Sequence, residues 1–140
     1  YIDVKKSIQN KFKRDNNLAY NLDQIVVSTG AKQSIANVCM VLLNPGDEVI
    51  LPAPYWVSYS AITTLSEAKP VVIPSSIDVD FKITPKQLEN SISSKTKLII
   101  FNSPNNPSGS IYSESEYREL ADVLKKYPNI YVSLMRYMNI

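Results

Sequence analysis

Residues 97–101 read Lys-Leu-Ile-Ile-Phe, and this almost wholly apolar run decides the fold of the chain. A strand with one face in water alternates apolar and polar residues, so a continuous apolar run predicts a central strand covered on both faces. Shorter β-branched runs at 25–28, 48–51, 70–73 and 130–132 are also predicted to be strands. Because longer amphipathic segments separate these runs, the pattern predicts a parallel sheet with helices on its faces.

The segments between the predicted strands carry helix signals of their own. Apolar residues recur at helical spacing in 4–12 and in 31–43, and residues 55–65 are also expected to be helical. Residues 84–92 begin with Thr-Pro, a favoured N-cap followed by a favoured first helical residue. Residues 113–126 begin with Ser-Glu-Ser-Glu, which has the spacing of a capping box.

Composition excludes several classes of function. The 140 residues include 15 basic and 13 acidic side chains, a net charge of +2 that lacks the basic footprint of a nucleic-acid-binding protein. No apolar run approaches the length of a membrane span. Histidine is absent, which excludes Ser-His-Asp triads and histidine-ligated metals. The single cysteine, Cys39, excludes an internal disulfide and any multi-cysteine zinc site, and no metal site is expected. It fits a reducing compartment, and we expect a cytoplasmic location.

Polar segments follow three of the predicted strands, where parallel α/β sheets bind their ligands. Residues 28–33, Ser-Thr-Gly-Ala-Lys-Gln, lead directly into a helix whose first N–H groups favour an anion such as phosphate. The alternative is a plain strand-to-helix turn that uses glycine. With three glycines and no GxGxxG motif, a dinucleotide fingerprint is excluded.

The second and third segments carry an indole and an amide. Residues 52–59 hold the only tryptophan, Trp56, which could stack on a planar aromatic cofactor or pack into the core. Residues 102–109 read Asn-Ser-Pro-Asn-Asn-Pro-Ser-Gly, in which the Asn106–Pro107 bond is a candidate cis peptide. An asparagine amide there could donate to a phenolate or carboxylate oxygen, and the alternative is a surface turn. We expect all three segments to converge on one pocket.

These motifs, together with Pro-Gly-Asp-Glu-Val at 45–49, resemble those of the class I (fold type I) pyridoxal-phosphate-dependent aminotransferases, especially the bacterial aspartate aminotransferase type. The resemblance extends to about Val132, with Ser108 standing where the family more usually has threonine. It implies an α/β fold, part of the parallel-rich three-layer α/β/α sheet of the large domain of these enzymes. Residues 1–132 would then be an incomplete cofactor-binding domain.

The resemblance also implies which residues bind the cofactor, pyridoxal 5'-phosphate. Gly30, Ala31 and Lys32 would form part of the phosphate cup, with the backbone amides of Ala31 and Lys32 as donors. Trp56 would stack on the pyridine ring and touch the substrate. Asn106 would bond the phenolic oxygen of the cofactor and the substrate carboxylate, next to a cis proline bond.

The implied reaction is transfer of an amino group between an amino acid and a 2-oxo acid. The substrate would be aspartate or a related dicarboxylic or aromatic amino acid, and the parent family is homodimeric. No nucleic acid or membrane partner is implied. None of the lysines matches the Schiff-base position, which would lie beyond residue 140, as would the substrate-binding arginine. We therefore expect no catalytic residue in this chain and no activity from it alone.

Both ends of the chain depart from the family pattern. Tyr1 opens on a helical pattern already under way, which predicts a chain cut from a longer protein, the alternative being a processed terminus. Residues 133–140 are an aberrant tail where the family has Leu-Ser-Asp-Glu-Ile-Tyr-Glu-His. One choice of codons for this tail is TCT CTG ATG AGA TAT ATG AAC ATA. Read two bases along, these codons encode Ser-Asp-Glu-Ile-Tyr-Glu-His. We hypothesise that a base was lost near the Val132 codon.

Two alternatives stay open. The chain could be a non-catalytic pseudogene product that at most binds weakly through a partial phosphate cup. It could also be a piece of another fold type I pyridoxal-phosphate enzyme, a lyase or a synthase. In either case, strands cut from their partners would leave apolar edges that favour aggregation.

Overall fold

The computed structural model describes residues 1–136 of the chain and contains two compact units. The first unit comprises Tyr1–Ser34 and the second begins at Ile35.

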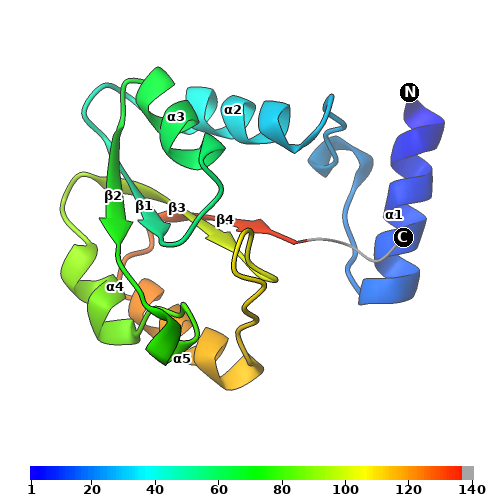
Figure 1. Cartoon of the computed structure of the whole chain (residues 1–140). Coiled ribbons are helices and arrows are strands. Elements are labelled where there is room, and N and C mark those ends of the chain that lie inside the picture. The colour runs from blue at the N-terminus through cyan, green and yellow to red at the C-terminus, as the bar shows by residue number, and fades with distance from the viewer. Residues whose placement is uncertain (137–140) are drawn as a thin grey trace. The chain divides into compact units, whose positions relative to one another are not determined.

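The second unit is built on a parallel sheet (Figure 1). Its strands are β1 (Glu48–Pro52), β2 (Lys69–Ile73), β3 (Thr96–Asn102) and β4 (Tyr131–Met135), in the order β2-β1-β3-β4. All three pairings are parallel. The apolar run that predicted a central strand forms β3, which pairs with a neighbour on each side. The predicted α/β class and parallel sheet are thus confirmed.

Helices cover both faces of this sheet in three layers (Figure 1). On one face lie α2 (Ala31–Leu42), from Ile35 onward, and α3 (Ser58–Leu65). On the other face lie α4 (Pro85–Ser91) and α5 (Glu114–Leu124), with the short 3-10 turn η2 (Ile77–Val79) before α4.

The side chains of β3 explain why its sequence is apolar on both sides. Leu98 and Ile100 pack on the face with α2 and α3, whereas Ile99 and Phe101 pack on the face with α4 and α5. Successive residues of a strand point to opposite faces, so a strand between two helical layers needs apolar residues at every position. The remaining buried residues of the first cluster are Ile35, Cys39, Leu43, Val49, Leu51, Tyr59 and Ala68. Those of the second are Ile50, Ile73, Ile83, Leu88, Tyr112, Leu120 and Val123.

The two predicted caps form as the sequence indicated. Thr84 Oγ1 accepts the backbone N–H of Gln87 at 3.2 Å, and Gln87 Oε1 accepts the N–H of Thr84 at 2.8 Å. Ser113 and Glu116 make the same reciprocal pair at the start of α5. The helix predicted from residue 55 begins instead at Ser58, with Val57 as its N-cap residue.

The first unit holds α1 (Ile2–Asn16) and the 3-10 turn η1 (Leu22–Gln24). The prediction of a strand at 25–28 is wrong. The backbone is extended at Ile25, with φ −109° and ψ 120°, but no strand of the described residues pairs with this segment. Val26 is 76% exposed. A strand is stabilised by hydrogen bonds to a neighbour, so extended conformation and β-branched composition alone do not make one.

The first residues of the predicted tail belong to β4. Ser133, Leu134 and Met135 pair with the last three residues of β3, and residues 137–140 lie outside the described residues. Within residues 1–136, β4 pairs only with β3, which leaves its outer edge without a strand. Leu134 is 47% exposed.

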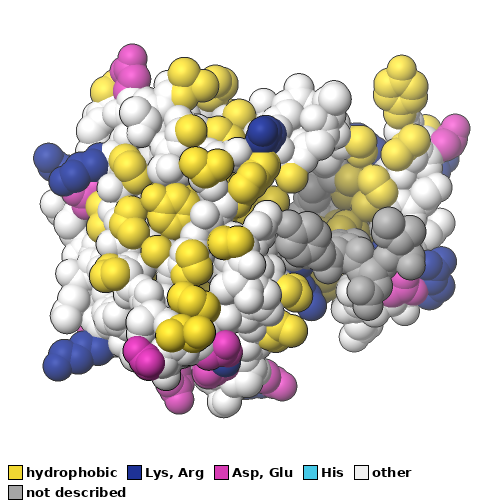
Figure 2. Space-filling model, viewed as in Figure 1, with side chains coloured by type: hydrophobic (Ala, Val, Ile, Leu, Met, Phe, Trp, Pro, Cys, Tyr) yellow, Lys and Arg dark blue, Asp and Glu magenta, His cyan; other side chains and the backbone are white. Residues whose placement is uncertain are grey.

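Apolar side chains also reach the surface. Figure 2 shows them gathered over the part of the second unit that carries α3, β2 and η2. Exposed apolar residues of these elements and of the turn before α3 include Val57, Leu65, Val72, Ile77 and Val79. Among residues 1–136, no helix is long and apolar enough to cross a membrane.

Candidate functional site

The segments after β1 and β3 meet at the carboxyl edge of the sheet. Asn105 Nδ2 donates to the backbone carbonyl of Pro54 at 3.0 Å, a contact between residues 51 positions apart. A small hollow at this edge is lined by Pro52, Tyr55, Tyr59, Ile100, Phe101, Asn102, Asn105 and Tyr112. The second and third polar segments therefore converge as the sequence predicted.

Asn106 is fixed through its backbone. Its N–H donates to Asn102 Oδ1 at 2.8 Å, and Asn102 Nδ2 donates to the carbonyl of Met135 at 3.0 Å. The Asn106–Pro107 bond is cis, as expected from the sequence, and so are Ala53–Pro54 and Ser103–Pro104. The half-buried Asn106 side chain is thus carried on a loop that is anchored to the ends of β3 and β4.

The loop around Asn106 also closes on itself. The N–H of Gly109 donates to the carbonyl of Asn105 at 2.9 Å, and the N–H of Asn105 donates to the carbonyl of Ser110 at 3.0 Å. Gly109 has φ +77°, a conformation that glycine adopts without the penalty of a side chain. Asn105 Oδ1 is buried and has no hydrogen-bond partner among the described residues.

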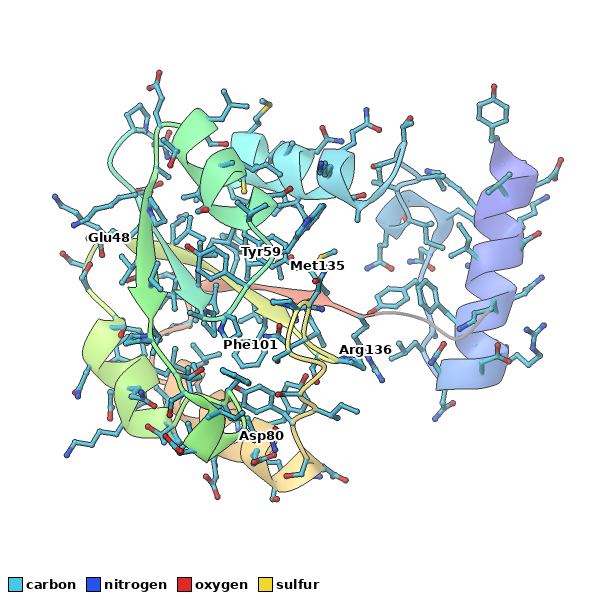
Figure 3. All side chains as sticks on the ribbon, viewed as in Figure 1. Glu48, Tyr59, Asp80, Phe101, Met135 and Arg136 are labelled. Carbon is cyan, nitrogen blue, oxygen red and sulfur yellow. The ribbon has the colours of Figure 1, made fainter. Side chains whose placement is uncertain are left out.

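Trp56 is half-buried and packs against the core cluster on the α2 and α3 face. Its ring meets that of Tyr59 edge-on, with 5.7 Å between centroids and 84° between planes. Figure 3 labels Tyr59, which comes from α3. The indole therefore contributes to the core, and stacking of Trp56 on a cofactor stays a prediction.

The first of the three polar segments, residues 28–33, lies in the first unit and leads into α2. Gly30 has φ +85°, and a Cβ added to it would meet no atom within 4 Å. Ser34 donates its N–H to the carbonyl of Gly30 at 3.3 Å, which begins the helix. The N–H groups of Ala31 and Lys32 belong to the first turn, where they point along the helix axis and favour an anion. Gly30, Ala31 and Lys32 are all exposed.

A cluster of charged side chains, Lys82, Asp80 and Glu116, lies beside the loop that carries Asn106, on the α4 and α5 face of the sheet. Lys82 Nζ lies 3.1 Å from Glu116 Oε1 and 3.3 Å from Asp80 Oδ2. The hydrogen bond from Lys82 to Glu116 raises the pKa of the Lys82 ammonium. The backbone N–H of Ser113, followed by Lys82, lowers the pKa of the Glu116 carboxyl. No local sequence pattern marks this cluster, since its members are separated by up to 36 positions along the chain.

Three further residues of the site were not singled out from the sequence. Asn102 orients the Asn106 backbone, Asn105 joins the two segments, and Tyr59 packs against Trp56. Asn102 and Asn105 lie in the quoted loop motif, so their position after a central strand was a signal available in the sequence. Tyr59 carried no such signal, because the contact depends on how α3 folds back.

The model of the family "Aminotransferase class I and II" matches residues 1–134. The chain belongs to this aminotransferase family. The chain is 48% identical over 130 residues to an aspartate aminotransferase of Rhizobium meliloti, covering 93% of this chain and 32% of that protein. It is 52% identical over 132 residues to a probable aspartate/prephenate aminotransferase of Rickettsia bellii, covering 94% and 33%.

Solved structures agree with the fold of this aminotransferase chain. The crystal structure of the Rhizobium meliloti aspartate aminotransferase has a TM-score of 0.91 at 47% identity, covering 94% of this chain and 33% of that one. Thermus thermophilus aspartate aminotransferase with maleate has a TM-score of 0.90 at 30% identity, covering 96% and 35%. The chain thus has the fold of these enzymes and spans about a third of the length of the curated relatives it matches.

The family implies pyridoxal phosphate, and the donor set fits that group. An accessible indole can stack on a planar ring, and an asparagine amide can donate to a phenolic oxygen. The N–H groups at a helix start suit a phosphate. Trp56, Asn106 and the Gly30–Lys32 turn supply these three kinds of group.

Proposed function

We propose that this chain supplies cofactor and substrate contacts for a pyridoxal-phosphate-dependent amino-group transfer between an amino acid and a 2-oxo acid. The observation that carries the proposal is the hydrogen bond between Asn105 and Pro54, which brings the Trp56 and Asn106 segments to one edge of the sheet. Membership of the aminotransferase family supports the same reaction.

Each contact residue has a distinct role in this proposal. Trp56 stacks on the pyridine ring and touches the substrate. Asn106 donates its side-chain amide to the phenolic oxygen and to the substrate carboxylate. The turn of Gly30, Ala31 and Lys32 holds the phosphate through backbone amides. When bound, pyridoxal phosphate supplies the electron sink that amino-group transfer needs.

The substrate in this proposal is aspartate or a related dicarboxylic or aromatic amino acid. The names of similar proteins support this class, because they refer to aspartate and to prephenate. The Thermus thermophilus structure with maleate, a dicarboxylate, supports it as well.

We further propose that the 140-residue polypeptide alone does not catalyse the reaction. The resemblance assigns none of its lysines to the Schiff-base position, and its own residues would bind and orient the cofactor without anchoring it covalently. A cytoplasmic location and a homodimeric parent enzyme belong to the same proposal.

Binding of pyridoxamine 5'-phosphate tests the contact roles, since this form lacks the aldehyde that reacts with surface lysines. Trp56 is the only tryptophan, so quenching of its fluorescence reports directly on the site. We expect saturable quenching, and a dissociation constant about tenfold higher in Asn106→Ala, the scale of a lost hydrogen bond to a charged group. Asn90→Ala, which changes an exposed asparagine of α4, serves as the matched control.

The outcomes separate the two parts of the proposal. Quenching that does not saturate, or that is the same in Asn106→Ala as in the unmodified chain, contradicts the contact roles. For the lack of catalysis, the chain is mixed with pyridoxal phosphate, reduced with borohydride and mapped by mass spectrometry. We expect only scattered modification of lysines, whereas saturable trapping on one lysine would contradict the proposal.

The reading of residues 133–140 as an out-of-frame tail is a separate proposal about the gene. It is supported by the seven family residues that appear when plausible codons are read two bases along. Resequencing the gene around the Val132 codon tests it, with a missing base as the expected result. A gene that encodes residues 133–140 without a missing base would refute it.

A further inference from the structure

The loop of residues 102–112 makes two contacts with the charged cluster and a third with the neighbouring Ile83. Ser110 Oγ donates to Asp80 Oδ1 at 3.3 Å, and Ser110 is only 7% exposed. The ring of Tyr112 lies under Lys82, with Nζ 5.8 Å from the ring centroid. The Tyr112 hydroxyl accepts the backbone N–H of Ile83 at 2.8 Å. Residues 80–83 thus contact the loop at Ser110 and Tyr112, a few positions after Asn106.

Lys82 is the cation of this cluster and pairs with both of its acidic residues. Its ammonium donates to both carboxylate oxygens of Glu116, at 3.1 and 3.2 Å, and pairs with Asp80. The Lys82 side chain is 21% exposed and that of Glu116 is 39% exposed, so the pair lies at the surface and is partly shielded from solvent. Because Lys82 pairs with the carboxylates of both Asp80 and Glu116, the cluster joins the residues after η2 to the first turn of α5.

The backbone beneath the cluster is strained. Asp80 and Phe81 both have positive φ, 53° and 52°, a conformation unfavourable for residues with side chains. The N–H of Phe81 donates to the carbonyl of Ser76 at 2.9 Å and holds this turn in place. Consecutive residues held in this way persist where the surrounding contacts compensate for their cost, and such strain is common at functional sites. Figure 3 labels Asp80, on the α4 and α5 side of the sheet.

We propose that Lys82 and Asp80 are positioning residues that hold the loop of residues 102–112, and hence the Asn106 side chain, in place for the cofactor and substrate. This inference rests on the proposed function for the role of Asn106. The loop closes on itself through Asn105, Gly109 and Ser110, so a tether on Ser110 is transmitted to Asn106 through a short hydrogen-bonded ring.

The test compares three variants of the full chain. Lys82→Met removes the charge and keeps a side chain of similar length, and Lys82→Arg restores a cation that can reach both carboxylates. Lys126→Met is the matched control, since Lys126 pairs with Glu89 at 2.8 Å across 37 residues and does not touch the loop. Hydrogen exchange is measured at the amides of Asn105, Asn106 and Gly109.

We expect loop exchange in Lys82→Met to be about fivefold faster than in Lys126→Met, equivalent to about 1 kcal/mol. Exchange of the β3 amides should be alike in these two variants, and Lys82→Arg should restore loop protection. The dissociation constant of pyridoxamine 5'-phosphate should rise about fivefold in Lys82→Met and be restored in Lys82→Arg. An ion pair that only stabilised the fold would leave this dissociation constant unchanged.

Two results would overturn the inference. One is loop exchange in Lys82→Met equal to that in Lys126→Met. The other is a faster-exchanging loop in Lys82→Met with the affinity for pyridoxamine 5'-phosphate unchanged. If the unmodified chain shows no saturable quenching, the proposed function fails by itself, and loop exchange still decides whether Lys82 holds the loop.

Discussion

Tyr112→Phe deletes one oxygen atom from the buried contact between the functional loop and the segment before α4. The hydroxyl accepts the N–H of Ile83 at 2.8 Å, and Tyr112 and Ile83 are 6% and 4% exposed. Phenylalanine keeps the ring contacts with Phe101 and Tyr117, whose centroids lie 5.0 and 5.5 Å away. The substitution therefore isolates the loss of one hydrogen bond and leaves a buried N–H without an acceptor.

A buried donor that loses its acceptor costs about 1–3 kcal/mol in the free energy of unfolding. With a urea dependence of about 2 kcal/mol per molar for a protein of this size, the unfolding midpoint should fall by about 0.5–1.5 M. The assay is urea unfolding followed by the fluorescence of Trp56 and by far-ultraviolet circular dichroism. The control is Tyr131→Phe in β4, where the side chain is 50% exposed and the change should stay within about 0.5 kcal/mol. Equal midpoints for Tyr112→Phe and Tyr131→Phe would refute the reasoning.

Three further predictions concern the thiol, acid stability and the sheet edge. Cys39 is fully buried and burial raises the pKa of its thiol, so a thiol reagent should label the native chain slowly and the urea-unfolded chain fast; rapid native labelling would contradict this. Because the folded-state pKa of Glu116 lies below its ordinary 4.5, its contribution to stability is present above that pH and lost as pH falls through the lowered pKa. In Glu116→Gln, the free energy of unfolding should fall less steeply as the pH is lowered. An unchanged dependence of this free energy on pH below about pH 4.5 would argue against the prediction. Leu134→Lys should reduce light scattering on warming more than Val79→Lys, because a lysine on an unpaired edge strand opposes intermolecular pairing; equal scattering would show that the β4 edge is not the site of association.

Much of the fold could be predicted because its signals are local. The apolar run of β3 indicated a central strand, and the caps at Thr84 and Ser113 marked two helix starts within a residue. Hydrophobic period and cap chemistry depend on neighbours a few positions away, so they can be read without the tertiary structure. The Trp56 segment and the Asn106 loop were found in the same way, because polar residues after a buried parallel strand lie at the ligand-binding edge.

Only the tertiary structure shows which of the predicted strands pair with a neighbour and which side chains contact one another. Residues 25–28 have strand composition, yet within the described chain they have no neighbouring strand to pair with. The cluster of Lys82, Asp80 and Glu116, and the bond from Asn105 to the Pro54 carbonyl, join residues far apart in sequence. Such contacts depend on how the layers close around the sheet, and no local pattern specifies the distance between two groups 34 or 51 positions apart. The sequence determined the elements and the candidate ligand chemistry, and packing determined which side chains hold that chemistry in place.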